Sequence, residues 1–246
     1  MTRLTLFFHR FASPPYFYAL SRPWGRAFAW IALALILIGL YGGLWLAPRD
    51  FQQGNGFRIM YVHVPSAWMS LFVFMVMAAS AFVGLVWRMR LAYAVAAASA
   101  PLGAAFTAVA LVTGSLWGKP MWGTYWVWDA RLTSELILFF LYLGFITLNR
   151  SFEDQQTGDR AAAILALVGA IDVPIVHYSV DWWQTLHQGS SFKGLTSEIA
   201  PSMLWPLLVM MTGFMFYYGW LVLWRARSEI LLRESDREWT RQVVKS

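Results

Sequence analysis

This 246-residue chain contains four histidines and a tryptophan-rich segment, and these are the residues best suited to binding a ligand. The segment reads WGTYWVWDAR over residues 122–131, and Trp117 lies shortly before it. Its indole rings offer flat faces and N–H groups that suit a large planar ligand with a polar edge, held where membrane meets water. The same tryptophans are equally well explained as an aromatic belt that only anchors helix ends.

Three of the histidines are candidate ligands. His63 and His187 lie next to apolar stretches, and His177 competes with His187 from the end of another stretch. Imidazole is a good axial donor to haem iron, and two histidines from separate elements could hold the iron from opposite sides of the macrocycle. Any one of them, taken alone, is more often a hydrogen-bonded structural histidine. We expect His9, beside Arg10, to be solvated or interfacial.

The composition decides the class of protein that must position these residues. Hydrophobic residues make up 59% and charged residues 13% of the chain, against roughly a quarter charged in soluble domains. The apolar residues fall in blocks long enough to cross a bilayer, so we predict an all-α integral membrane bundle. The chain has no cysteine, which excludes disulfides, thiolate metal sites and thioether attachment of haem.

Six transmembrane helices are predicted, and two prolines affect their expected bounds. The second helix should open just after Pro65, because a missing N–H is harmless at a helix start. Pro101 should either kink the third helix or mark its first turn. The predicted spans are 27–47, 66–87, 91–117, 130–149, 161–177 and 201–224, and Asp172 and Pro174 should interrupt the fifth.

The start of the fourth predicted helix carries three polar residues. A span of about 20 residues must begin near residue 130, which makes Asp129 the N-cap. Glu135 then falls inside the membrane, four residues after Arg131. That spacing would let the two side chains pair on one helix face.

The basic residues predict the orientation of the bundle. Of the 19 Lys and Arg, 14 fall in the termini and the connections on their side, and 5 fall in the opposite connections. This asymmetry places both termini in the cytoplasm and the tryptophan-rich segment outside. The net charge of +6 then reflects topology and attraction to anionic membrane lipid, and we expect no nucleic-acid binding. Residues 1–225 would form the membrane domain and 226–246 a cytoplasmic tail, with a basic amphipathic helix over 226–243.

Three segments in combination carry a family resemblance: WGTYWVWD at 122–129, YVHVPSAW at 61–68 and TLHQG at 185–189. With six spans and this short length, the chain resembles the CcmC family, the haem exporters of cytochrome c maturation that share the WWD motif. The resemblance covers nearly the whole chain. It implies a bacterial inner-membrane protein that gathers haem at the outer surface.

The resemblance also implies roles for residues and partners. His63 and His187 would be the axial ligands of a noncovalent, b-type haem, with the haem iron as the only metal. The haem would be passed to the chaperone CcmE, and energy would come from an ATP-binding cassette complex of CcmA, CcmB and CcmD. The platform and contact residues would be Trp117, Trp122, Tyr125, Trp126, Trp128, Asp129, Arg131, Trp182 and Trp183, with His177, Lys119 and Glu135 as secondary candidates.

The sequence excludes some activities and leaves two alternatives open. Residues 114–120 have the wrong spacing for a phosphate-binding loop, and no hydrolytic triad or carboxylate pair stands out, so we expect neither ATPase nor hydrolase activity. In a haem permease, Asp172, Pro174 and Glu135 would mark a broken helix or a polar path across the bilayer; interhelical hydrogen bonding is the simpler explanation. A membrane b-type electron-transfer cytochrome would place its histidines nearer the centres of spans.

Overall fold

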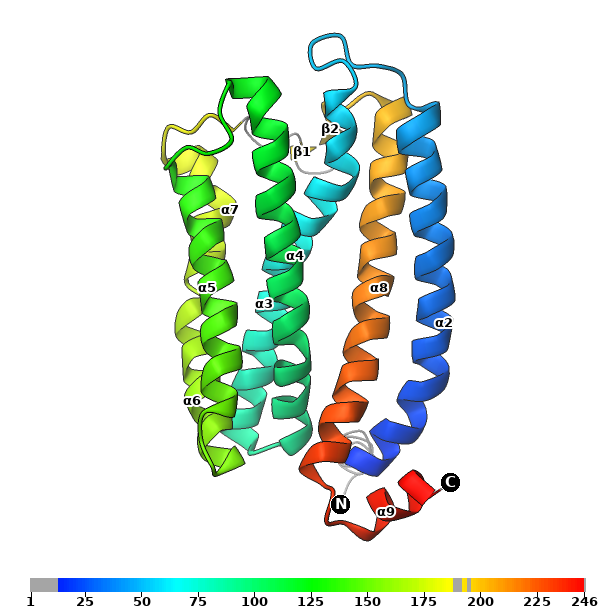
Figure 1. The fold of residues 1–246 in the computed structure, drawn as a ribbon, viewed down its shortest axis with the longest axis vertical. Coiled ribbons are helices and arrows are strands. Elements are labelled where there is room, and N and C mark those ends of the chain that lie inside the picture. Colours follow the sequence, from blue (N-terminus) through cyan, green and yellow to red (C-terminus); the bar gives the residue numbers. More distant parts are fainter. Residues whose placement is uncertain (1–12, 188–191, 194–195, 246) are drawn as a thin grey trace.

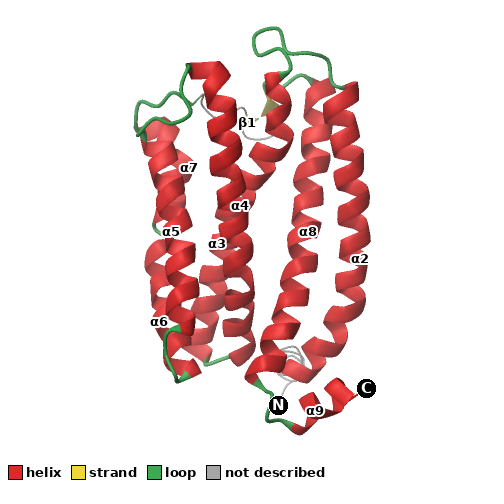
Figure 2. Cartoon of the chain, viewed as in Figure 1, coloured by secondary structure: helices red, strands yellow, loops and turns green. Residues whose placement is uncertain are grey.

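A computed structural model describes residues 13–187, 192–193 and 196–245, and it is a bundle of long helices (Figures 1 and 2). The only strands in this described part are two antiparallel pieces of two residues each. The elements are α2 (Pro14–Tyr41), η1 (Gly42–Leu46), η2 (Gly56–Ile59), α3 (Met60–Trp87), α4 (Arg90–Trp122), α5 (Ala130–Arg150), α6 (Gln155–Gly169), α7 (Asp172–Trp182), β1 (Phe192–Lys193), β2 (Thr196–Ser197), α8 (Pro201–Arg233) and α9 (Glu238–Lys245).

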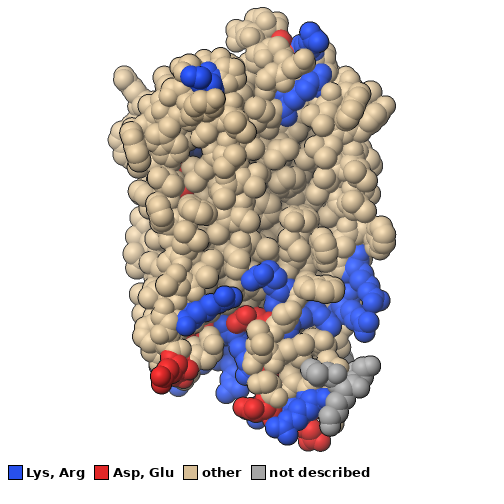
Figure 3. Space-filling view, viewed as in Figure 1, with Lys and Arg blue, Asp and Glu red and all other residues tan. Residues whose placement is uncertain are grey.

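Six helical segments are long and apolar enough to cross a membrane, which confirms the predicted number. They are Pro14–Leu46, Gly56–Trp87, Arg90–Trp122, Ala130–Arg150, Gln155–Trp182 and Pro201–Arg233. On the face drawn in Figure 3, Lys, Arg, Asp and Glu gather toward the two ends and leave a broad apolar band between them. Charge is costly in the hydrocarbon region, so this distribution is the one expected of a multi-pass membrane protein.

Helices α2 and α8 form a pair along one side of the bundle (Figure 1). Glycines lie at their seam: a side chain at Gly39 would meet Met210, one at Gly213 would meet Ile36, and one at Gly219 would meet Phe28. Small residues let membrane helices approach closely, and van der Waals packing then holds them together.

The main core lies among α3, α4, α5 and α6. Tyr142 of α5 is fully buried there; its ring packs against Gly103 of α4, and its hydroxyl donates a hydrogen bond to the Ser70 carbonyl of α3 at 2.7 Å. A buried phenol needs such an acceptor. The contact fixes α3, α4 and α5 relative to one another, and these are the helices that carry most of the candidate site.

The start of the second span differs from the prediction. Helix α3 begins at Met60, so Pro65 lies inside it and His63 stands in its first turn. Proline removes one backbone hydrogen bond. Burial of Met60 and Tyr61 in a cluster with Phe57 and Leu207 stabilises the additional turn and offsets that loss.

The fifth span is interrupted close to the predicted place: it is two helices, α6 and α7, that meet at Ala170 and Ile171, just before Asp172, and Pro174 lies within α7. Two other predictions change. The predicted helix over 226–243 is instead the end of α8, a turn, and α9. Ile230 is buried against Leu91 and Ala94 of α4, so this part of α8 belongs to the bundle. Pro101 lies inside α4, not in its first turn.

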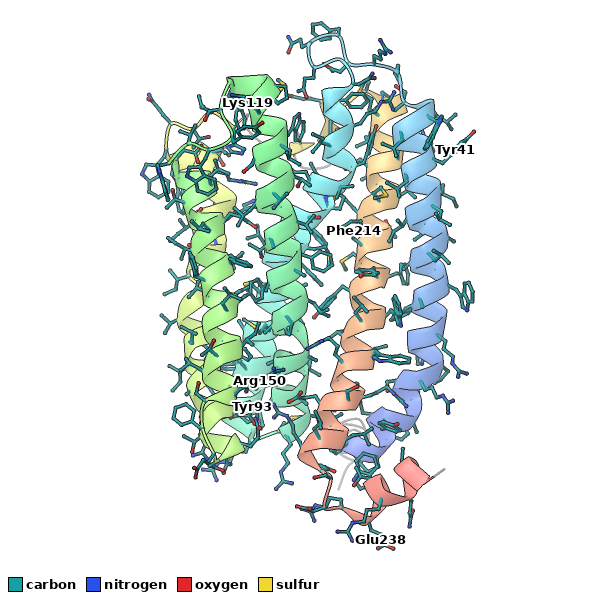
Figure 4. The ribbon with its side chains drawn as sticks, in the orientation of Figure 1. Tyr41, Tyr93, Lys119, Arg150, Phe214 and Glu238 are labelled. Atoms are coloured by element: carbon teal, nitrogen blue, oxygen red, sulfur yellow. The ribbon has the colours of Figure 1, made fainter. Side chains whose placement is uncertain are left out.

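The ends of the helices that carry the tryptophan-rich segment lie together at one end of the bundle, called the tryptophan end below. Lys119 and Tyr41 mark it in Figure 4, opposite Glu238. At this end α2 closes with the π-helix Gly42–Leu46, and the Arg58 guanidinium donates to the carbonyls of Gly43 and Ala47. Arg58 thereby satisfies helix-end acceptors that would otherwise lack partners.

Candidate functional site

An open cavity of about 900 Å³ lies at the tryptophan end, and neither His63 nor His187 is among its lining residues. One wall is the end of the tryptophan-rich segment, and the other is the end of α7 with the residues that follow it. The lining residues are Val127, Trp128, Asp129, Val180, Asp181, Trp182, Trp183, Gln184, Thr185 and Leu186.

Asp129 joins this segment to His187. Its Oδ1 accepts a hydrogen bond from the Leu132 backbone N–H at 2.8 Å, which confirms Asp129 as the N-cap of α5. Its Oδ2 lies 3.4 Å from Nδ1 of His187. The Trp122 ring meets the same imidazole edge to face, with ring centres 4.7 Å apart. His187 is therefore held on two sides by the tryptophan-rich segment.

His63 is held by one face of α4. Its Nδ1 lies 3.1 Å from the Ala110 carbonyl oxygen and 3.1 Å from the Thr113 hydroxyl. The Trp117 ring meets the imidazole edge to face at 5.7 Å, and a side chain at Gly114 would lie 3.0 Å from its Cε1. The ring is thus enclosed by α4 on its Nδ1 side.

The hydrogen bonds assign the same tautomer to both histidines. A carbonyl and an ionised carboxylate only accept hydrogen bonds, so Nδ1 of His63 and Nδ1 of His187 must each carry the proton. In each ring Nε2 then carries the lone pair, and neither Nε2 has a hydrogen-bond partner among the described residues. Metal-ligating histidines have this arrangement, with one nitrogen held by an outer acceptor and the other left for the metal.

The two imidazoles approach the same stretch of α4. His63 contacts Trp117 and His187 contacts Trp122, and both tryptophans belong to α4. Outside the spans, burial lowers the pKa of His187 from its usual 6.5, and the neighbouring Asp129 carboxylate partly opposes this shift. His187 is therefore neutral at physiological pH, as an iron ligand must be.

The other tryptophans have distinct environments. Trp117 donates its indole N–H to Gln53 Oε1 at 3.0 Å. The indole N–H of Trp126 is buried without a partner among the described residues, and its ring meets that of Trp128 edge to face at 5.3 Å. Trp128 is 75% exposed, and Trp182 and Trp183 are more than half exposed beside the cavity. An unpartnered buried donor calls for an explanation, and a polar ligand edge would supply an acceptor.

The two basic candidates, Arg131 and Lys119, have different contacts. Arg131 donates through one guanidinium nitrogen to the carbonyls of Val176 and His177 of α7, at 3.1 and 3.4 Å. Its remaining N–H groups have no protein partner in the part of the chain that is described, so they are available to an anion. Lys119 donates to the Gly123 carbonyl at 3.0 Å and lies over the Tyr125 ring at 5.2 Å. Its ammonium group therefore connects the end of α4 to the tryptophan-rich segment.

The predicted ion pair between Arg131 and Glu135 is wrong. Glu135 accepts a hydrogen bond from the Ser70 hydroxyl of α3 at 2.7 Å, and Arg131 turns toward α7. Ser70 lies in the core where Glu135 is also buried, so the interhelical hydrogen bond satisfies a group that the membrane would otherwise leave unpaired.

His177 is placed apart from the other two candidates. It is exposed on α7, its ring meets Tyr178 at 4.7 Å, and only its backbone carbonyl contacts Arg131. Within the described residues its ring does not contact the tryptophan-rich segment, whereas His187 contacts both Trp122 and Asp129. His9 and residues 188–191 lie outside the described residues.

Several contact residues were not predicted from the sequence: Gln53, Ala110, Thr113, Gly114 and Ser70. Residues of these types are common in helices and loops, so their presence alone predicts no function. Each has its role because it contacts a residue distant in the chain. The spacing 110, 113, 114 and 117 does place four residues on one helix face. That pattern could have pointed to a shared neighbour, but not to His63.

Comparisons with known proteins agree over nearly the whole chain. The family model described as heme exporter protein C matches residues 7–241. The heme exporter protein C of Escherichia coli is 48% identical over 239 residues, covering 96% of each chain. Those of Haemophilus influenzae (48%, 97% of each chain) and Bradyrhizobium diazoefficiens (52%, 90% of this chain and 84% of the relative) are similar. This chain belongs to the CcmC family, the heme exporter proteins C of cytochrome c biogenesis.

Proposed function

We propose that the chain binds haem at the tryptophan end, with His63 and His187 as axial ligands, and hands it on. The observation that carries this proposal is the matched state of the two imidazoles: each gives its Nδ1 proton to an acceptor, and neither Nε2 has a partner among the residues that the structure describes. Haem is the cargo of this site, held noncovalently since the chain has no cysteine.

The neighbouring side chains fit the rest of a haem molecule. Trp122, Trp126 and Trp128 would supply flat apolar contacts, and the Arg131 N–H groups that have no partner among the described residues would pair with a propionate. Trp182 and Trp183 line the cavity together with Trp128. Aromatic faces with one basic anchor suit a macrocycle whose body is apolar and whose edge is anionic.

The proposed place in the cell follows from the charge asymmetry. With both termini cytoplasmic, the tryptophan end faces the periplasm of a bacterial inner membrane, and haem would pass from there to the chaperone CcmE. CcmA, CcmB and CcmD would be partners in an ATP-binding cassette complex. The opposite end of the bundle, where α2 begins and α8 ends (Figure 1), would contact anionic lipid on the cytoplasmic side through Arg22, Arg26, Arg225 and Arg227 of these two helices.

The decisive experiment measures haem in purified full-length protein. We expect a six-coordinate, histidine-ligated visible spectrum, and we expect His63→Ala and His187→Ala each to lose the six-coordinate signature and most of the haem. His177→Ala is the matched control, because it removes an imidazole at the same end that is exposed. Wild-type spectra for both His63→Ala and His187→Ala would overturn the assignment.

A second candidate, passage of haem through the chain, is favoured by Asp172. This side chain is only 8% exposed, and its Oδ2 has no partner among the described residues, at the break between α6 and α7. An intramembrane acid at a helix break is typical of transport paths. Asp172→Asn should slow haem appearance at the periplasmic face only if haem crosses here; normal delivery by that variant would remove this candidate.

A further inference from the structure

We propose that one face of α4 sets the tautomer and the rotation of the His63 ring, with Thr113 as a positioning residue. This inference rests on the proposed haem site and extends it to side chains that would not touch haem. The face consists of Ala110, Thr113, Gly114 and Trp117, which recur at helical spacing and all contact the imidazole.

The direction of the Thr113 hydrogen bond is fixed by its own donor. A hydroxyl has one proton, and the Thr113 hydroxyl lies 2.6 Å from the Val109 carbonyl and 3.3 Å from that of Ala110. Its proton is therefore used within α4, and its oxygen faces Nδ1 of His63 as an acceptor. The Nδ1 proton is shared between Thr113 and the Ala110 carbonyl, both at 3.1 Å.

Gly114 and Trp117 limit how far the ring can rotate. A Cβ at Gly114 would lie 3.0 Å from Cε1 of His63, so a side chain there would push the ring away from the helix by a few tenths of an ångström. Trp117 covers the ring at 5.7 Å and is itself held by Gln53. Together with the two acceptors, these contacts fix the direction in which Nε2 points.

A fixed direction matters because an axial bond needs a lone pair that is already aimed at the metal. Outer partners of metal-bound histidines orient the ring and raise its basicity, and losing one typically costs about 10- to 100-fold in affinity. The effect of Thr113 should stay near the lower figure, since the Ala110 carbonyl remains as a second acceptor.

The first test uses haem-free, full-length protein in lipid nanodiscs. Nitrogen-15 spectra of labelled histidine report which ring nitrogen carries the proton. We expect His63 to be the Nδ1–H tautomer in the wild type and in Thr113→Ser, and a mixture or a shifted Nδ1 signal in Thr113→Val. Identical His63 signals in the wild type and Thr113→Val would overturn the proposal.

The second test titrates haem into the same proteins. Thr113→Val should bind about tenfold more weakly, and Thr113→Ser should stay close to the wild type. Thr107→Val is the matched control: like Thr113→Val it removes a hydroxyl of α4 that donates to a helix carbonyl, but Thr107 is buried elsewhere on α4 and no contact with His63 is found among the described residues. In the His63→Ala background, Thr113→Val should have no further effect on the residual affinity.

The outcomes separate this inference from the proposed function. If His63→Ala binds haem as the wild type does, the ligand assignment itself is wrong. If His63→Ala loses haem while Thr113→Val matches Thr107→Val in affinity and spectrum, only the positioning role of Thr113 is overturned. Thr113→Ala replaces the valine variant if that protein does not accumulate, and the same two outcomes decide.

Discussion

Replacing Asp129 with asparagine should separate the two contacts of one carboxylate. Asparagine is as strong an N-cap as aspartate, so it can still accept the Leu132 N–H that Asp129 binds at 2.8 Å. Its amide nitrogen would then face Nδ1 of His187, where Oδ2 now lies at 3.4 Å. Two donors cannot face each other, so the His187 proton should move to Nε2 and remove the lone pair meant for iron.

The size of the effect follows from what each variant loses. Loss of an outer acceptor from a metal-bound histidine costs about 10- to 100-fold in affinity, which is about 1.4 to 2.7 kcal/mol at about 1.36 kcal/mol per factor of ten. Asp129→Asn should show this loss with an unchanged free energy of unfolding in the haem-free protein. Asp129→Ala should show it too, together with about 1 kcal/mol of lost helix-cap stability.

The assay pairs haem titration with thermal unfolding of the haem-free protein. Asp154 is the control, because it caps α6 through the Thr157 N–H at 2.9 Å and has no contact with either candidate ligand among the described residues. Asp154→Ala should lower the melting temperature and leave haem affinity unchanged. Wild-type haem affinity in Asp129→Asn, with destabilisation only in Asp129→Ala, would show that Asp129 is a helix cap and nothing more.

Three further predictions address the tryptophans, the pH dependence and the orientation. Changing the three tryptophans within residues 122–128 to alanine together should weaken haem retention at least fivefold, at about 1 kcal/mol per ring; normal haem retention in this triple alanine variant would leave only an interfacial anchor. Burial lowers the pKa of His187 below 6.5, so below pH 6.5 the folded protein binds fewer protons than the unfolded chain. Haem affinity and the free energy of unfolding should therefore be constant above pH 6.5 and fall as the pH drops below it. Constant values of both down to pH 5 would contradict this. The chain has no cysteine, so a single cysteine at Gln184 should react with an impermeant reagent from the periplasmic side, and labelling only from the cytoplasmic side would invert the topology.

Rules that use only neighbouring residues predicted the parts of the fold that depend on contacts within one helix. The start of α5 and its Asp129 cap follow from span length and capping preference, and the structure confirms both. The start of α3 was wrong, because the rule for Pro65 ignores the burial of Tyr61. The ion pair of Arg131 with Glu135 was wrong for a similar reason: spacing within one helix says nothing of Ser70 on another.

The candidate site shows the same division. Residue types and spacing identified His63, His187 and the tryptophan-rich segment as candidates. The link between Asp129 and His187 joins residues 58 positions apart, and the link between Thr113 and His63 joins residues 50 apart. Such contacts depend on how the helices pack, which a single sequence does not reveal.

The pairing of α2 with α8 has a consequence for how the chain is assembled in the membrane. These are the first and the last spans of the described structure, whereas α3 to α7 follow one another and share a core. During synthesis the earlier spans enter the bilayer first, so α3 to α7 can pack before α8 is present to cover the face of α2 that carries Gly39. The Tyr61 hydroxyl, which donates to the Met203 carbonyl at 3.2 Å, joins α3 to α8. The first turn of α3, where His63 lies, therefore gains this hydrogen bond only after α8 has been synthesised and inserted.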